Sequence, residues 1–234
     1  MNNLKICVTF TAFKRLDYLK QTLDALHESF KYSNIYLPIL FSVDYYDDSI
    51  KNYIQKIDWT DTTISINDPS VGCNKNTKLA ITMGLNDNDA IIHLEDDTVP
   101  AKDCIKFFVE NINKYYDHSN IICIGGYNRT TEPMANMINE TVKTVGFTCW
   151  GCGFWRHKSQ ILLENWIPYM NRENNSMSWD SHLNQNVFIP NNLYQIRPVI
   201  SRIQNIGSND GTWLQDPDFH KQHHHTPYTS NNFI

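Results

Sequence analysis

The sequence has no apolar run long enough to span a bilayer and no excess of positive charge. The first residues, MNNLKICVTF, enter a predicted strand without the charged region, apolar region and cleavage site of a secretory leader. The formal net charge of -5 argues against a nucleic-acid binder that relies on a basic surface. We therefore expect a soluble, cytoplasmic protein with no nucleic-acid partner and no transmembrane segment.

Cysteine motifs are also scarce. Of the six cysteines, only Cys149 and Cys152, in TCWGC, form a CxxC, and the others are scattered among apolar residues. This pattern is typical of reduced core thiols rather than of a disulfide framework. A structural zinc site normally needs a second pair, and a redox motif belongs at a helix start in a thioredoxin-like unit. We expect this CxxC to be chemically idle.

The chain is long enough to bury a sizeable core. Its 234 residues, 41% hydrophobic and 12% aromatic, indicate one large domain or two small, closely joined ones. Strand-like and helix-like segments alternate in the first half, which predicts an α/β fold with an open, mostly parallel sheet flanked by helices. Strands are expected at 5–13, within 36–48, at 62–68, 89–97 and 121–127, and helices at 15–29, 74–85, 101–119 and from about 158.

Three consecutive acids follow the fourth predicted strand. In IIHLEDDTVP, Glu95, Asp96 and Asp97 come directly after a near-continuous apolar run. Adjacent carboxylates are costly to bury unless a cation meets them. In open α/β sheets, ligands bind outside the carboxyl ends of the strands. The cluster is therefore either a solvated acidic turn or a site for a divalent cation and the group that the cation carries.

Several segments in order resemble the GT-A glycosyltransferases. They are FKRLDYLKQTLDAL, Asp44 at the end of the second strand, NKNTKLA, LEDD, CWGCGFWRHKSQ and SWDSHLN…IRPVISRIQNIGSNDGTW. The last two are similar to segments of bacterial family-2-like sugar transferases. The EDD, the W-D pair and RPVISR also resemble the eukaryotic N-acetylglucosaminyltransferase of hybrid N-glycan synthesis. The resemblance implies a nucleotide-sugar-binding half at 1–98, a smaller acceptor-side lobe at 99–215 and a tail at 216–234.

The resemblance also implies a metal cofactor. In such enzymes the acidic cluster holds Mn²⁺ or Mg²⁺, which bridges the diphosphate of the donor. These hard cations prefer a few carboxylates together with substrate phosphates. By this resemblance Asp97 contacts the metal, Asp96 faces the ribose or metal-bound water, and Glu95 faces the sugar or a backbone group.

Further donor-binding residues are carried over from the same resemblance. Asp44 is expected at the base or ribose, although a turn aspartate is the alternative. Thr11 and Arg15, near the end of the first strand, are expected close to the nucleotide, and a solvated helix-start arginine is the alternative for Arg15. Asn74 and Lys78 lie in the first turns of a helix whose N-terminus favours anionic groups.

Asp180, in SWDSH, is the candidate catalytic residue. Inverting transfer needs a carboxylate opposite the leaving diphosphate to accept the proton of the acceptor hydroxyl. The resemblance gives Asp180 this role and makes Trp179 a wall against the sugar. The alternative for Asp180 is a helix N-cap.

The remaining candidates lie in the second half. Trp150 is expected to floor a sugar pocket or to pack in the core, and Gly151 would let the backbone approach the sugar closely. Arg202 and the loop 205–212 are expected to fold over the diphosphate. His220 and His223 either complete the metal site or belong to a solvated tail.

The sequence therefore predicts a metal-dependent, inverting glycosyltransferase that uses a nucleotide-diphosphate sugar, with UDP favoured, and a sugar or glycan acceptor. A nucleotidyltransferase is the first alternative, but TFTAFKRL lacks the glycines of its usual signature. A non-catalytic nucleotide-sugar-binding module is the second.

Overall fold

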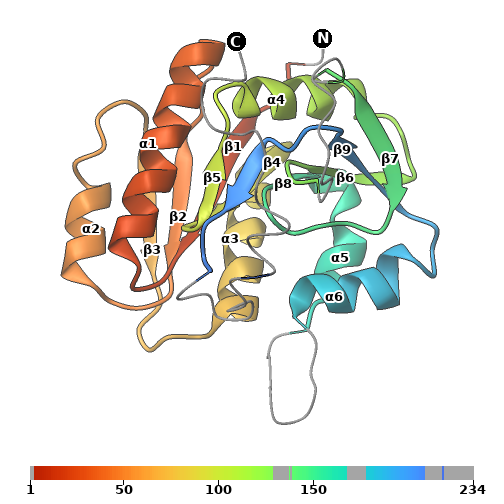
Figure 1. Cartoon of the computed structure of the whole chain (residues 1–234). Coiled ribbons are helices and arrows are strands. Elements are labelled where there is room, and N and C mark those ends of the chain that lie inside the picture. The colour runs from red at the N-terminus through yellow and green to blue at the C-terminus, as the bar shows by residue number, and fades with distance from the viewer. Residues whose placement is uncertain (1–2, 129–136, 138, 168–177, 209–217, 219–234) are drawn as a thin grey trace.

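The computed structural model describes residues 3–128, 137, 139–167, 178–208 and 218 (Figure 1). Its strands are β1 (Ile6–Ala12), β2 (Ile39–Val43), β3 (Thr62–Ile66), β4 (Ala90–Glu95), β5 (Thr98–Pro100), β6 (Ile121–Gly125), β7 (Thr141–Val145), β8 (Cys152–Trp155), β9 (Tyr194–Pro198) and β10 (Ile203–Asn205). Its α-helices are α1 (Leu16–Ser33), α2 (Asp48–Ile54), α3 (Cys73–Asp87), α4 (Cys104–Lys114), α5 (Gln160–Glu164) and α6 (Trp179–Leu183).

The described strands form an eight-stranded sheet in the order β3-β2-β1-β4-β8-β6-β9-β7 and a small sheet of β5 and β10. β3, β2, β1 and β4 are parallel to one another. β8 is antiparallel to both β4 and β6, β9 is parallel to β6, and β7 is antiparallel to β9. The predicted open, mostly parallel α/β sheet is therefore confirmed.

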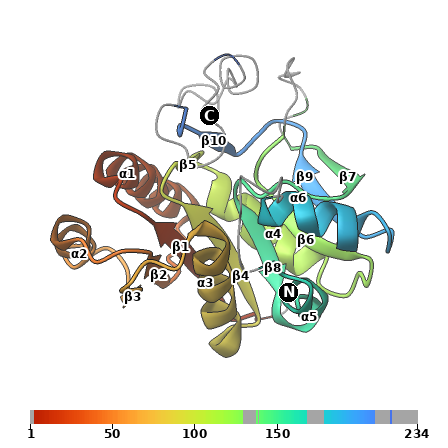
Figure 2. The ribbon, with the colours of Figure 1, turned by 90° about the horizontal axis from the view of Figure 1, so that it is seen from below.

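Helices cover both faces of the sheet. One core cluster joins the sheet to α1 and α4, and a second joins it to α3, α5 and α6 (Figures 1 and 2). β4 supplies both clusters, because Ile92 and Leu94 face the first and Ile91 faces the second. A strand buried on both faces needs a near-continuous apolar sequence, as in IIHL.

The helix α1 illustrates how the sequence pattern produces an element. Leu19, Leu23, Leu26 and Phe30 recur at helical spacing, and all four are buried. The helix ends at Asn34, whose left-handed backbone (φ 52°) is a common helix-stop conformation. The predicted helices at 15–29, 74–85 and 101–119 are confirmed as α1, α3 and α4, with shifted ends.

Two features differ from the sequence-based expectation. The acids at 47 and 48 begin the helix α2, because Asp47 caps it by accepting hydrogen bonds from the backbone N–H groups of Ser49 (2.8 Å) and Ile50 (3.2 Å). In the second half, β7, β8, β9 and β10 were not anticipated, because their sequences do not alternate clearly. Their strand partners are distant in the sequence, and pairing rather than local pattern defines them.

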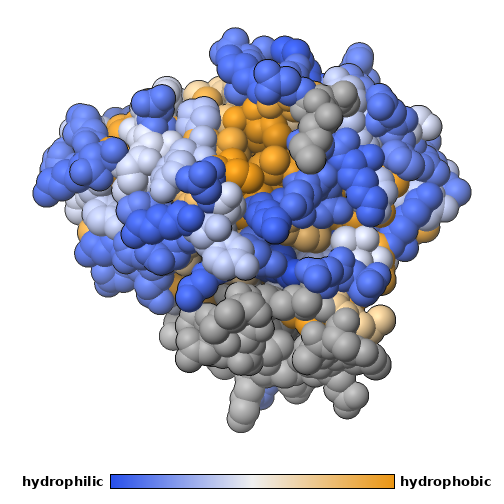
Figure 3. Space-filling view, turned by 90° about the horizontal axis from the view of Figure 1, so that it is seen from above, coloured by the Kyte–Doolittle hydropathy of each residue, from blue (hydrophilic) through white to orange (hydrophobic). Residues whose placement is uncertain are grey.

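The face at the amino ends of the parallel strands is mostly hydrophilic, with one apolar area near its centre (Figure 3). Among the described residues, no helix is long and apolar enough to cross a membrane.

Candidate functional site

The candidate site lies at the carboxyl ends of β1, β2 and β4, the edge that faces the viewer in Figure 2. Thr11 of β1 is paired in register with Glu95, the last residue of β4. Asp44 directly follows β2. The parallel pairing of β1, β2 and β4 thus brings residues from three separate segments to one edge, as the strand order predicts.

Arg15 binds two of the three consecutive acids. Its Nη1 donates a hydrogen bond to Asp97 Oδ2 at 2.8 Å, and its Nε donates to Asp96 Oδ2 at 3.3 Å. Nη2 of Arg15 forms a further ion pair with Asp96 Oδ1. Asp96 Oδ2 also accepts from the backbone N–H of Phe13 at 3.1 Å. The loop between β1 and α1 is therefore fastened directly to the acidic cluster.

The second half of the chain reaches the same cluster through the small β5–β10 sheet. Asn205 Nδ2 donates to Asp97 Oδ1 at 3.2 Å, and the backbone N–H of Ile206 donates to the carbonyl of Asp97 at 2.8 Å. A Cβ atom at Gly207 would lie 2.3 Å from Asp97 Oδ2, so only glycine permits this approach. Asn205 belongs to the loop expected near the diphosphate, but its contact with Asp97 had no signal in the sequence.

Burial and mutual repulsion dominate the electrostatics of the acids. Burial raises the pKa of Asp96 to about 7, although Arg15 opposes this shift. Burial raises the pKa of Glu95 well above its ordinary value, and the charges of Asp97, Asp96 and Asp180 add to the rise. Burial alone would lower the pKa of Arg15, but its two carboxylate partners outweigh burial and keep it charged. One guanidinium does not neutralise this group of carboxylates.

Asp180 lies in the first turn of α6 and close enough to Glu95 for its charge to contribute to the raised pKa of that residue. The helix begins after Ser178, so Asp180 is not its N-cap. The hydroxyl of Ser178 donates a hydrogen bond to Asp180 Oδ1.

Burial raises the pKa of the Cys149 thiol, and the nearby Asp180 adds to this rise. The first cysteine of the CxxC thus lies beside the candidate base, a proximity that the sequence did not predict.

The carboxylate of Asp44 is occupied by donors within the protein. It accepts hydrogen bonds from the side chains of Asn67 (3.2 Å) and Ser70 (2.8 Å) and from the backbone N–H groups of Val71 and Gly72, both at 2.8 Å. Asp44 is also buried. In this structure, Asp44 holds the loop that leads into α3.

The N-terminus of α3 adjoins the acids. Burial raises the pKa of Cys73, the first residue of α3, and the nearby charges of Glu95, Asp97 and Asp96 add to the rise. Asn74 is buried, and neither polar atom of its side chain has a partner among the described residues. Its backbone carbonyl accepts from Trp166 Nε1 at 2.8 Å. Lys78, one turn further on, is half-buried.

Two tryptophans of the candidate set differ in their surroundings. Trp150 is half-buried and packs edge-on against Tyr127, with ring centroids 4.7 Å apart. Trp179 is buried, and its ring stacks on that of Trp166 at 4.6 Å and 14°. Gly151, after Trp150, has a φ of 68° and lies against Ile203, whose Cγ1 would be 2.6 Å from an added Cβ. Close packing within the fold thus accounts for this glycine.

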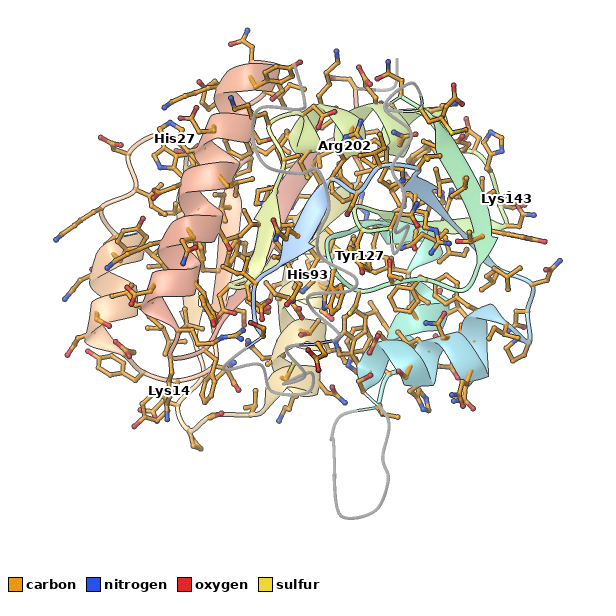
Figure 4. All side chains as sticks on the ribbon, viewed as in Figure 1. Lys14, His27, His93, Tyr127, Lys143 and Arg202 are labelled. Carbon is orange, nitrogen blue, oxygen red and sulfur yellow. The ribbon has the colours of Figure 1, made fainter. Side chains whose placement is uncertain are left out.

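Arg202 is not brought to the acidic cluster. It is buried beneath α4, where its Nε donates to Asp103 Oδ2 at 2.8 Å and its Nη1 donates to the carbonyl of Ile200 at 2.6 Å. Figure 4 places Arg202 near α4, whereas Lys14, the neighbour of the acid-bound Arg15, lies at the opposite edge of the sheet. The other distant candidates, His220 and His223, fall outside the described residues.

The carboxylate oxygens of the acidic cluster suit a hard divalent cation that also binds a phosphate group. Within the described part of the chain, no three His, Cys, Asp or Glu side chains are arranged to hold a metal ion by themselves. Mg²⁺ and Mn²⁺ commonly use only one or two carboxylates and take their remaining ligands from water and substrate phosphates. Asp97 and its neighbours supply such oxygen atoms together with an excess of negative charge.

Comparison with known proteins identifies the fold. No family model and no curated protein matches the sequence. Among solved structures, S. aureus TarS 1-349 matches with a TM-score of 0.60 and 14% identity, over 88% of this chain and 61% of that one. The mannosyltransferase PcManGT from Pyrobaculum calidifontis, in complex with GDP-Man and Mn²⁺, matches with a TM-score of 0.55 and 12% identity, over 83% and 55%.

HddC from Yersinia pseudotuberculosis matches with a TM-score of 0.52 and 13% identity, and the alignment covers 94% of this chain and 97% of that one. The chain thus spans between half and two thirds of the length of the first two neighbours and nearly all of HddC. The structural neighbours share the GT-A architecture, which confirms the predicted fold class.

Proposed function

We propose that the protein is a metal-dependent, inverting glycosyltransferase that moves a sugar from a UDP-linked donor to a hydroxyl of a sugar or glycan acceptor. The observation that carries the proposal is the convergence of Glu95, Asp96 and Asp97 with Asp180, which comes from a distant segment, at the carboxyl edge of a GT-A sheet. We assign donor binding to residues 1–98 and acceptor binding to 99–215.

Structural neighbours support a nucleotide-sugar donor. TarS has been solved with UDP and with UDP-GlcNAc, and PcManGT with GDP-Man and Mn²⁺. The sequence resemblance to the N-acetylglucosaminyltransferase of hybrid N-glycan synthesis favours UDP. We assign Thr11, Arg15, Asn74 and Lys78 to the nucleotide and diphosphate. The unpartnered, buried amide of Asn74 supports its place in this set.

The proposed cofactor is Mn²⁺ or Mg²⁺, held by Asp97. Bound there together with the diphosphate, the metal would neutralise charge on the leaving group. Burial is the main cause of the raised pKa of Glu95 and of Asp96, and the neighbouring carboxylates add to it. A cation bound beside them would offset both effects, which supports this assignment.

Asp180 is the proposed general base. Its carboxylate would take the proton of the acceptor hydroxyl while that oxygen attacks the anomeric carbon. Ser178 donates to one of its oxygens and so orients the carboxylate. Trp150, which is half-buried and follows Cys149, is the proposed floor of the sugar pocket.

The test is sugar transfer from a panel of UDP- and GDP-sugars to simple glycosides with Mn²⁺, followed by NMR of the product linkage. We expect a product of opposite anomeric configuration to the donor. Asp180→Asn should lower transfer by roughly 10²–10⁴-fold, the usual contribution of such a base, and leave UDP binding nearly unchanged. Retention of configuration, or near-normal transfer by Asp180→Asn, would contradict the assignment.

A cytoplasmic location is part of the same proposal. All six cysteines are free thiols, and Cys7, Cys104, Cys123 and Cys152 are buried. Buried, reduced thiols are typical of proteins that work in a reducing compartment.

A further inference from the structure

All three nitrogens of the Arg15 guanidinium contact the acidic cluster, and its carbon lies 5.5 Å from the centroid of the Tyr18 ring. Nε, Nη1 and Nη2 each contact a carboxylate oxygen of Asp96 or Asp97. The side chains of Arg15, Asp96 and Asp97 are 19%, 3% and 9% exposed. This is an internal charge pairing rather than a surface ion pair, so it is only weakly screened by salt.

Both oxygens of Asp97 are in use. Oδ2 accepts from Arg15 at 2.8 Å and Oδ1 accepts from Asn205 at 3.2 Å. A divalent cation bound to either oxygen would lie within a few ångströms of the guanidinium. Asn205 is neutral and carries no charge that would repel a cation, but Arg15 is positively charged, has no acceptor and does not lose its proton. Cation binding at Asp97 and the present position of Arg15 are therefore in conflict.

The backbone around Arg15 is held by contacts that do not involve its guanidinium. The backbone carbonyl of Arg15 accepts from the N–H of Leu19 at 3.0 Å, and Thr22 of the same helix donates to the carbonyl of Asp96 at 2.8 Å. Arg15 precedes α1 with φ −115° and ψ 65°, after Lys14 with a left-handed φ of 56°. The helix α1 is thus anchored to the acidic turn independently of the guanidinium.

We propose that Arg15 is the resident counter-ion of the nucleotide-free site, that a divalent cation displaces it from Asp96 and Asp97, and that it then pairs with the diphosphate of the incoming nucleotide. This inference rests on the proposed function and adds an exchange of partners to it. A guanidinium is suited to both roles, because its fork matches carboxylate and phosphate alike.

The exchange has a thermodynamic consequence. Metal alone must bind weakly, because it has to expel Arg15 without offering the guanidinium a new partner. Metal with UDP must bind more tightly, because the diphosphate accepts the displaced guanidinium. Metal and nucleotide affinities are then positively coupled, and the coupling is reciprocal. Removing Arg15 removes the part of the coupling that the exchange supplies, and the part that arises from direct contact between the metal and the diphosphate remains.

The test is titration of Mn²⁺ into the full chain, with free Mn²⁺ followed by EPR, in the absence and presence of UDP. Arg15→Gln removes the charge and keeps much of the side-chain volume. Without UDP it should bind Mn²⁺ more tightly than the wild type by about 10-fold or more, because a nearby like charge has been removed. With Mn²⁺ saturating, its UDP affinity should fall. Arg15→Lys, which keeps the charge and loses the fork, should lie between the two.

Lys20→Gln is the matched control, since Lys20 is a cation of α1 that pairs with Asp17 on the surface. It should leave the Mn²⁺ affinity within about twofold of the wild type, because exposed charges are well screened. Circular dichroism establishes that each variant is folded. If the wild type binds Mn²⁺ with UDP but Arg15→Gln binds Mn²⁺ no more tightly than the wild type, the counter-ion role is overturned and the proposed function stands. If the wild type binds neither Mn²⁺ nor UDP, both fail.

Discussion

Asn205 donates a hydrogen bond to Asp97 at 3.2 Å although the two residues are 108 positions apart in the chain. Asn205 ends β10, whose antiparallel pairing with β5 sets Asn205 opposite Thr98, the residue after Asp97. The amide oxygen of Asn205 also accepts from the backbone N–H of Gly207 at 2.9 Å. A small two-stranded sheet therefore ties the second half of the chain to the acid assigned to the metal.

Asn205→Ala should destabilise the fold by about 1–3 kcal/mol, because it removes two buried hydrogen bonds and leaves Asp97 with one donor fewer. Chemical denaturation measures the loss. Gln160→Ala, which removes an exposed side chain paired with Glu164, should change the free energy of unfolding by less than about 0.5 kcal/mol. Equal stabilities of the two variants would mean that the Asn205–Asp97 contact contributes little.

Asp44 leads to a second prediction, on loop stability. In Asp44→Asn the side chain keeps one acceptor oxygen for four hydrogen-bond donors, and its NH₂ group faces backbone N–H groups. We expect a loss of about 2–4 kcal/mol in the free energy of unfolding without any nucleotide present. Asp48→Asn, at an exposed acid that pairs with Tyr46, is the control and should stay within about 0.5 kcal/mol of the wild type. Normal stability of Asp44→Asn with lost UDP affinity would instead favour the ribose or base role expected from the sequence.

His93 predicts how stability depends on pH. It is fully buried in β4, its Nδ1 lies 3.1 Å from Thr9 Oγ1, and burial lowers its pKa from 6.5 to about 3. The folded state therefore keeps His93 neutral, while the unfolded chain takes up a proton below pH 6.5. The stabilisation that comes from keeping His93 neutral in the folded state is complete above pH 6.5. It is lost as the pH falls from 6.5 toward 3, at about 1.4 kcal/mol per pH unit.

As the pH falls from 6.5 to 5, the stability of His93→Asn relative to the wild type should rise by up to about 1.4 kcal/mol per pH unit, measured by denaturation at several pH values. The raised pKa values of Glu95 and Asp96 affect both proteins alike. His157→Gln, at an exposed histidine, should keep the slope of the wild type. An unchanged slope in His93→Asn would show that another group governs acid unfolding.

The first half of the fold could be predicted because its elements carry their own patterns. The leucines of α1 and the apolar run of β4 identify a helix and a strand from local sequence, and the parallel order follows from their alternation. β8 could not be predicted in this way. Its four residues, CGFW, become a strand by lying between β4 and β6, and no local signal encodes that insertion.

The same distinction holds for the site. The position of Glu95, Asp96 and Asp97 at a strand end could be predicted from the sequence, as could the location of Thr11 and Arg15 beside them. What could not be predicted is the partner of each side chain. Trp179 stacks on Trp166 in the core, and Arg202 pairs with Asp103 beneath α4, yet in sequence both look like exposed ligand-binding residues. Partners that are distant in the chain decide such cases.

The acidic turn after β4 is assigned to a metal–nucleotide complex, and calorimetric titration of UDP tests this assignment most directly. UDP should bind the wild type in Mn²⁺ and should bind much more weakly in excess chelator, because the diphosphate then lacks its cation. Asp97→Asn should lose the difference between the two conditions and keep its fold, as judged by circular dichroism. Equal UDP affinity of the wild type with Mn²⁺ and with chelator would contradict the assignment.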